Sequence, residues 1–248
     1  MKKIGLQIYT VRECLQDTAQ AKAVLSEIKA FGYGEVELYG GDVDFMVQYA
    51  RMAEESGLPV CGAVSNMKHY QDVEKTVKFC RTFGISNICV SSAPVRTQEE
   101  AERYISEVNT LIRELQPHGI TVSYHNHCGE FIRLENGRTF FDMLTAQCPA
   151  MGFTLDLYWA QRAGMDVRHC MDVLGERVDT LHLKDVRQVD EHTATFAPVG
   201  EGNLYWEGIL AKAGEIGVRH YIVEQDSCEE APVRCVGKSI AYLKAFQN

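Results

Sequence analysis

The stretch Thr180–Asp185, TLHLKD, is a short run in which polar and apolar residues alternate. A period of two residues is typical of a β-strand, so the two leucines face one side of the strand, and His182 and Lys184 face the other. The stretch therefore predicts a strand, Thr180–Lys184, that presents a histidine and a lysine on the same face.

Similar short runs occur seven more times, and helical spacing of apolar residues follows each of them. The other predicted strands are Gly5–Tyr9, Glu35–Tyr39, Val60–Val64, Asn87–Ser92, Thr121–His125, Gly152–Asp156 and Tyr221–Glu224. The predicted helices lie near residues 21–31, 45–52, 73–83, 98–116, 139–146, 167–174, 206–216 and 233–246, and a long loop covers 185–204. Eight strand–helix units predict a parallel sheet with crossover helices, and the number eight favours a closed α/β fold, the (β/α)8 TIM barrel.

Composition and charge restrict the class of protein. The 248 residues, 46% of them hydrophobic, suit a single TIM-barrel domain that spans residues 1–248. A formal net charge of −9 weighs against a nucleic-acid partner. Residues 1–13 lack the apolar core of a signal peptide, and no apolar run approaches the roughly 20 residues that span a bilayer. We therefore expect a cytoplasmic protein with no membrane partner, whose nine cysteines, none in a CxxC pair, are reduced.

The active site of a TIM barrel lies at the carboxyl ends of its strands. Glu130 follows the fifth predicted strand, and the next three strands end in Asp156, His182 and Glu224. Each residue alone is more often a core histidine, a helix N-cap or a rim charge. Together they predict one divalent metal ion, because buried carboxylates repel one another without a cation. We expect Mn²⁺, with Zn²⁺, Co²⁺ or Mg²⁺ as alternatives.

Further polar and aromatic side chains at the same end of the barrel are candidate substrate ligands: Gln7, Tyr9, Glu37, Trp159 and Lys184. Aromatic faces pack against sugar rings, although a tryptophan is more often part of the core. Glu37 could equally be a rim carboxylate. Lys184 could bind a sugar hydroxyl, act as an acid or base, or pair with a carboxylate of the barrel.

At YHNH (124–127), LDLYW (155–159), HLKD (182–185) and VEQD (223–226) the sequence resembles the xylose isomerase-like TIM barrels. This superfamily of sugar phosphate isomerases and epimerases includes inosose dehydratases and keto-sugar epimerases. The resemblance covers nearly the whole chain and implies a divalent ion held by a glutamate, an aspartate, a histidine and a second glutamate. Many relatives place the first glutamate directly at the end of strand five, where this chain has His125. The strand-five ligand is therefore either Glu130 or His125. Gly200–Trp206 resembles the glycine-rich substrate loop of these proteins.

The residues and the resemblance together predict an isomerase or epimerase of a sugar or sugar-like polyol, which removes a proton next to a carbonyl. The metal would stabilise the enediolate, and the candidate catalytic residues are His127, Glu224, Lys184 and His125. A lyase or dehydratase acting on a keto-inositol or a 3-keto-glycoside shares the first step and is the alternative. Endonuclease relatives need more metal-binding histidines, and a noncatalytic sugar-binding protein would bind metal without turnover. Barrels of this class commonly pair, so the prediction includes a homo-oligomer.

Overall fold

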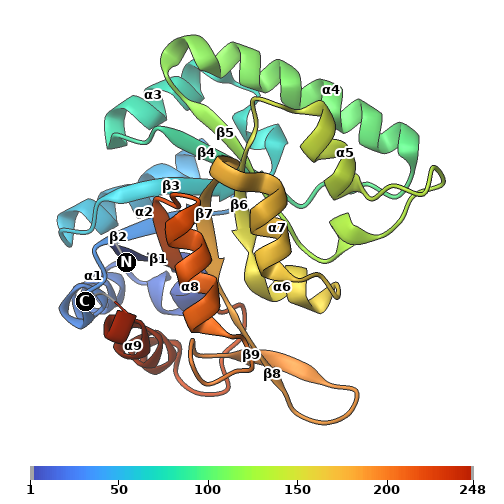
Figure 1. The fold of residues 1–248 in the computed structure, drawn as a ribbon. Coiled ribbons are helices and arrows are strands. Elements are labelled where there is room, and N and C mark those ends of the chain that lie inside the picture. Colours follow the sequence, from blue (N-terminus) through green and yellow to red (C-terminus); the bar gives the residue numbers. More distant parts are fainter. Residues whose placement is uncertain (1–2, 247–248) are drawn as a thin grey trace.

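The computed structural model describes residues 3–246 and closes eight parallel strands into a barrel (Figure 1). Met1 and Lys2, part of the N-terminal segment interpreted above, lie outside the described residues, as do Gln247 and Asn248. Around the barrel the strands follow the order β1, β2, β3, β4, β5, β6, β7 and β10, and β10 pairs with β1 to close the sheet. The predicted single (β/α)8 TIM barrel is confirmed.

The barrel strands are short and almost fully buried, as expected for parallel strands with side chains packed on both faces. Their bounds are β1 Ile4–Gln7, β2 Glu35–Tyr39, β3 Val60–Ser65, β4 Asn87–Ser91, β5 Thr121–His125, β6 Gly152–Asp156, β7 Val178–Leu183 and β10 His220–Val223. Three of them, β2, β5 and β6, have the bounds predicted from the sequence.

The helices cover the outside of the barrel, where Figure 1 shows them as a ring around the strands. They are α1 Thr18–Phe31, α2 Val43–Glu55, α3 Val73–Phe83, α4 Gln98–Leu115, α5 Phe140–Gln147, α6 Leu157–Arg162, α7 Val167–Leu174, α8 Trp206–Glu215 and α9 Pro232–Leu243. The sequence starts the first three with aspartates, because the carboxylates of Asp17, Asp42 and Asp72 each accept a hydrogen bond from a backbone N–H of the first turn.

Three segments differ from the prediction, and one of them is α6, a helix over Leu157–Arg162 that was not predicted. The first strand ends at Gln7 rather than Tyr9, because the Gln7 side chain accepts a hydrogen bond from the Tyr9 N–H and starts the 3-10 helix Ile8–Leu15. The predicted loop over 185–204 contains an antiparallel hairpin, β8 (Asp185–Gln188) and β9 (Ala194–Ala197), which extends away from the barrel (Figure 1). The hairpin strands, DVRQ and ATFA, lack the apolar run that marks the barrel strands of equal length.

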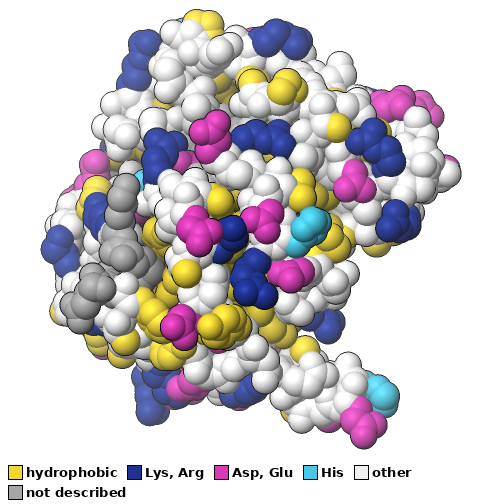
Figure 2. All heavy atoms as spheres, in the orientation of Figure 1, with side chains coloured by type: hydrophobic (Ala, Val, Ile, Leu, Met, Phe, Trp, Pro, Cys, Tyr) yellow, Lys and Arg dark blue, Asp and Glu magenta, His cyan; other side chains and the backbone are white. Residues whose placement is uncertain are grey.

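The surface carries both signs of charge. On the face in Figure 2, basic and acidic side chains are interspersed rather than gathered into separate fields. Of the helices within residues 3–246, none combines the length and apolar character needed to cross a membrane.

Candidate active site

Four buried side chains meet at the carboxyl ends of four neighbouring strands: His125 from β5, Asp156 from β6, His182 from β7 and Glu224 just after β10. One ligand atom from each lies within 4.8 Å of the others. The parallel register brings them level, since Asp156 and His182 are paired across β6 and β7. Three of the four predicted metal ligands are therefore brought together, and His125 is the fourth member of the cluster.

Glu130, the other predicted metal ligand, lies outside this cluster. Its carboxylate accepts hydrogen bonds from the Tyr124 hydroxyl (2.7 Å) and from the backbone N–H of His127 (2.9 Å). Tyr124 packs against Tyr104 of α4, on the helical side of β5. Because successive residues of a strand face opposite sides, His125 faces the barrel interior while Tyr124 and its partner Glu130 lie behind the strand.

The orientation of His182 is set by Glu37 and Gln7. The His182 Nε2 atom lies 2.6 Å from the Glu37 carboxylate, which also accepts a hydrogen bond from the Gln7 amide (2.7 Å). The remaining ring nitrogen, Nδ1, is thereby turned toward Asp156 and Glu224, at 3.8 and 2.7 Å. Histidines that bind metals are commonly oriented by a carboxylate in this way. Glu37, which was predicted to bind substrate, contacts His182 and Gln7 in this structure.

The cluster suits a divalent ion. Ligand atoms bonded to one ion at about 2.0 to 2.2 Å lie within roughly 4.4 Å of one another, close to the observed spacing. Nδ1 of His182 lies 2.7 Å from Glu224 Oε2 without forming a hydrogen bond to it, and Nδ1 of His125 has no hydrogen-bond partner among the described residues. His125 Nε2 lies 3.2 Å from Asp156 Oδ2, so two histidines and two carboxylates converge in one buried cluster. Nitrogen and oxygen ligands of this kind fit a shared cation.

Lys184 adds a buried positive charge beside the cluster. Its Nζ lies 3.0 Å from Asp156, 2.9 Å from Glu224 and 2.8 Å from Asp226. Burial alone would lower the pKa of Lys184, but the carboxylates, Asp156 foremost, raise it above the ordinary value. Burial likewise opposes ionisation of Glu224, yet Lys184 and His182 lower its pKa to about 2. The site thus holds an ammonium group and ionised carboxylates at neutral pH.

His127 supplies a neutral imidazole. Burial, and then the neighbouring His125, lower the pKa of His127 to about 4. Its ring centroid lies 4.8 Å from that of His125 and 5.5 Å from that of Trp159. His127 is therefore uncharged at neutral pH, and Trp159 packs beside it at the edge of the site.

A cavity of about 340 Å³ opens over the cluster at the carboxyl ends of the strands. The predicted residues that line it are Gln7, Tyr9, His125, His127, His182, Lys184 and Glu224. Sequence reasoning missed other polar residues of its wall, which are Ser65, Asn66, His69, Ser91, Ser92 and Asp226. Most of them lie at the ends of β3 and β4, so the strand-end rule applied to the later strands could have identified them.

The glycine-rich loop Gly200–Trp206 is held by Asp185, a buried carboxylate at the start of β8. The backbone N–H groups of Gly200, Gly202 and Leu204 donate to this carboxylate at 2.9, 3.1 and 3.2 Å. The indole Nε1 of Trp206 donates to it at 2.7 Å. The N–H groups of the loop thus donate their hydrogen bonds to the Asp185 carboxylate of the same chain.

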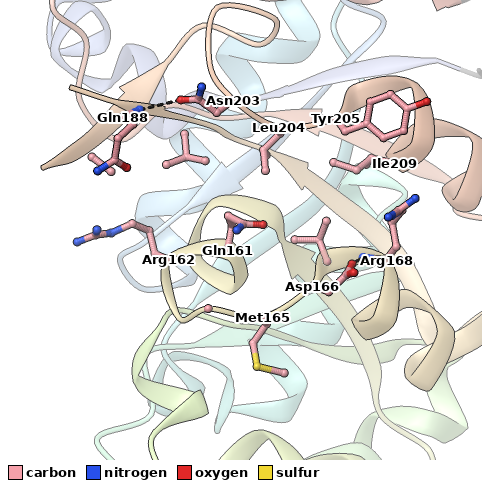
Figure 3. Close-up of a pocket in the computed structure, with 14 residues that line it drawn as sticks. Gln161, Arg162, Met165, Asp166, Arg168, Gln188, Asn203, Leu204, Tyr205 and Ile209 are labelled. Atoms are coloured by element: carbon pink, nitrogen blue, oxygen red, sulfur yellow. Dashed lines mark hydrogen bonds between the residues drawn. The ribbon is translucent and has the colours of Figure 1, made fainter. Parts of the chain in front are cut away.

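A second hollow, of about 620 Å³, lies outside the barrel between α6, α7 and the loop before α8 (Figure 3). Arg162, Asp166, Arg168, Leu204 and Tyr205 are among its lining residues. None of the predicted catalytic, substrate-binding or metal-binding residues lines it. The chemistry-bearing side chains face the barrel cavity instead.

The sequence and the fold of this chain are similar to those of known proteins. A family model described as "Xylose isomerase-like TIM barrel" matches residues 25–246. The inosose dehydratase of Mesomycoplasma hyopneumoniae strain 7448 is 24% identical, over 72% of this chain and 70% of that protein. A sugar phosphate isomerase/epimerase from Parabacteroides distasonis ATCC 8503 superposes with a TM-score of 0.82 at 25% identity, covering 99% of this chain and 94% of that one. The 3-keto-D-glucoside 4-epimerase YcjR of E. coli shares the fold, with a TM-score of 0.69, 13% identity and 98% of both chains covered.

Proposed function

Because the chain belongs to the xylose isomerase-like TIM barrel family, we propose that it is a divalent-metal-dependent epimerase or isomerase of a sugar or keto-sugar. The observation that carries the proposal is the buried cluster of two histidines and two carboxylates beside the Lys184 ammonium, facing one cavity at the carboxyl ends of the strands. Many relatives hold their ion with a strand-five glutamate, whereas here the geometry favours His125 in that place. The ion would be held by His125, Asp156, His182 and Glu224.

When bound, the ion would act as a Lewis acid that stabilises negative charge on the substrate oxygen. Glu224 contacts Lys184 and His182 through Oε2. Within residues 3–246, no hydrogen bond or ion pair is formed by its other oxygen, Oε1. Oε1 is therefore the proposed base that removes the proton next to the carbonyl. The Lys184 ammonium would donate a hydrogen bond to the oxygen that becomes negative, which lowers the energy of the enediolate.

A dehydratase is the second candidate, because one relative of this chain is named inosose dehydratase. It would begin with the same proton removal, after which a hydroxyl group leaves from the neighbouring carbon. The two candidates differ in their products: an epimerase or isomerase conserves the composition of the substrate, and a dehydratase releases water.

The metal content of purified protein tests the site. We expect about one divalent ion per chain, lost in His182→Ala and in His125→Ala but retained in Glu130→Gln, which serves as the matched control. Loss of the ion in Glu130→Gln but not in His125→Ala would return Glu130 to the ligand set. A wild-type protein that binds no ion, even with added Mn²⁺ or Zn²⁺, would contradict the proposal.

Proton exchange tests the reaction. Ketohexoses, their phosphate esters, a keto-inositol and a 3-keto-glucoside would be incubated with the protein in D2O. We expect deuterium to enter one of them next to the carbonyl, at a rate that falls at least about 100-fold in Glu224→Gln. No exchange with any of these compounds in the metal-loaded wild type would contradict the proposed reaction.

A further inference from the structure

One wall of the cavity carries a histidine that lies away from the metal cluster. His69 lies in the 3-10 helix Met67–Tyr70, directly after β3, and lines the cavity. Three strands separate β3 from β7 in either direction around the closed barrel. His69 therefore lies on the wall opposite His182, near the end of β7, and Lys184, which directly follows that strand.

The hydrogen bonds of His69 determine where its proton is held. The Ser65 hydroxyl donates to the backbone carbonyl of Gly41 at 2.7 Å, and Ser65 Oγ lies 2.8 Å from His69 Nδ1. A serine hydroxyl has one hydrogen, and here the Gly41 carbonyl receives it. Ser65 must then accept from an N–H on Nδ1, so the neutral imidazole has its lone pair on Nε2. His69 Nε2 forms no hydrogen bond to any residue within 3–246.

The local fold makes this arrangement rigid. The Asn66 side chain caps the 3-10 helix by accepting a hydrogen bond from the Lys68 N–H (3.2 Å). Tyr70 is fully buried, and its hydroxyl donates to the Ala63 carbonyl at 2.8 Å. His69 is therefore held in place by the Asn66 cap at the start of the 3-10 helix and by the buried Tyr70 at its end. A proton-transfer group needs such positioning, because small displacements are costly in rate.

We propose that His69 is the second proton-transfer group of this site and that the reaction is an epimerisation at a carbon next to a carbonyl. This inference rests on the proposed function. Glu224 takes the proton from one face of the carbon, and the electrons of the C–H bond move to form the enediolate. A proton carried by His69 Nε2 is then given to the opposite face, the carbonyl re-forms, and the carbon is inverted. One proton leaves and one enters, and solvent restores both groups.

Placing the two groups on different sides of the cavity distinguishes epimerisation from the other outcomes. An isomerase that moves a carbonyl along one face can use one group on one wall for both transfers. A dehydratase needs an acid at the leaving hydroxyl and gives no inverted product. Glu224 follows β10 and His69 follows β3, with β1 and β2 between these strands on one side and four strands on the other. Both residues line the cavity, so they reach it from different sides, which suits removal from one face and return to the other.

The variant His69→Asn tests the proposal, because its amide can still donate to Ser65 while the Nε2 position is lost. In D2O, with the metal-loaded protein and the substrate that exchanges in wild type, we expect inversion to fall at least about 100-fold. Exchange of deuterium into the unconverted substrate, which needs only Glu224, should fall less than about 5-fold. His192→Gln, at an exposed position of the hairpin, is the matched control and should change neither rate.

Four results would overturn the proposal. Exchange and inversion that fall together in His69→Asn, with metal content and thermal unfolding unchanged, would make His69 a substrate ligand. Inversion that persists in His69→Asn would place the second group elsewhere, while the proposed function would stand. A wild type that releases water would be a dehydratase, and a wild type that exchanges no proton would contradict the proposed function itself.

Discussion

At the scale of single residues, the ammonium group of Lys184 holds the active site together electrostatically. It is fully buried, and the carboxylates of Asp156, Glu224 and Asp226 lie within 3.0 Å of its nitrogen. A buried charge is tolerated only when it is paired. The same contacts would serve both stability and the proposed chemistry, since they keep the lysine charged beside the position proposed for the substrate oxygen.

Replacing Lys184 with methionine should lower the stability of the folded protein. The change keeps most of the side-chain volume but leaves three carboxylates without their partner. We expect the free energy of unfolding to fall by about 3 to 5 kcal/mol, measured by urea denaturation without added metal. Lys238→Met removes an exposed lysine that pairs with Glu230 and Glu201, and it should leave stability nearly unchanged. Equal losses in both variants would contradict this account.

Most of the site residues from strands five to eight could be predicted from the sequence, because the two-residue period of a β-strand fixes which side chains face the barrel interior. This reasoning placed Asp156, His182 and Glu224 at one end of the barrel, where the structure has them. The position of Glu130 could not be predicted in this way, because it follows a turn after strand five, and the period of the strand does not determine the path of that turn. His69 was also missed, since it lies four residues after the end of β3, inside a short 3-10 helix.

At the scale of elements, an ion pair joins two strands that are not neighbours. Glu35 of β2 and His220 of β10 lie 2.8 Å apart at the opposite end of the barrel from the active site, and β1 runs between them. The contact passes over Gly5, where a Cβ atom would lie 2.9 Å from Glu35 Cγ. Glycine at this position lets two side chains meet across a strand.

This pair should make stability depend on pH. The hydrogen bond to Glu35 raises the pKa of His220 above 6.5, so its contribution is complete below that pH and is lost as the pH rises through the folded-state pKa. Burial opposes ionisation of Glu35, but His220 lowers its pKa below 4.5, and that contribution is lost as the pH falls. The unfolding midpoint of wild type should exceed that of His220→Gln most between about pH 4.5 and 6.5. A difference that is constant across pH would contradict the pairing.

The loop between β9 and α8 gives a second test at this scale. A Cβ atom on Gly202 would lie 2.3 Å from Asp185 Oδ1 and 2.5 Å from the Val186 carbonyl oxygen. Gly202→Ala should therefore lower the free energy of unfolding by about 1 to 3 kcal/mol. Gly214→Ala, where the added Cβ meets nothing within 4 Å, should not lower it. Chemical denaturation of both variants checks the comparison, and a Gly202→Ala as stable as wild type would contradict it.

The elements themselves were largely predictable, because buried parallel strands give apolar runs and the helices have clear caps and stripes. The hairpin of β8 and β9 was not, since its strands lack the apolar run that marks barrel strands of the same length, such as β1 and β10. The early end of β1 depends on one hydrogen bond between Gln7 and Tyr9, which no periodic pattern encodes.

At the scale of the whole molecule, the proposed ligands come from β5, β6, β7 and β10, which are consecutive around the barrel. A bound ion would therefore link half of the strands. At a free Mn²⁺ concentration of about 100 times the dissociation constant, we expect the free energy of unfolding to rise by about 2.7 kcal/mol. The gain should disappear with a chelator and in His125→Ala, and it should persist in Glu130→Gln. Equal stability with and without Mn²⁺ would contradict a site formed only by folding.

The carboxylate of Asp185 has a consequence for the cost of ordering the loop Gly200–Trp206. Because it accepts hydrogen bonds from Gly200, Gly202, Leu204 and Trp206, the chain entropy of this segment is lost during folding. The segment is in its final conformation before any ligand binds, so a ligand that contacts it would spend no binding energy on ordering it.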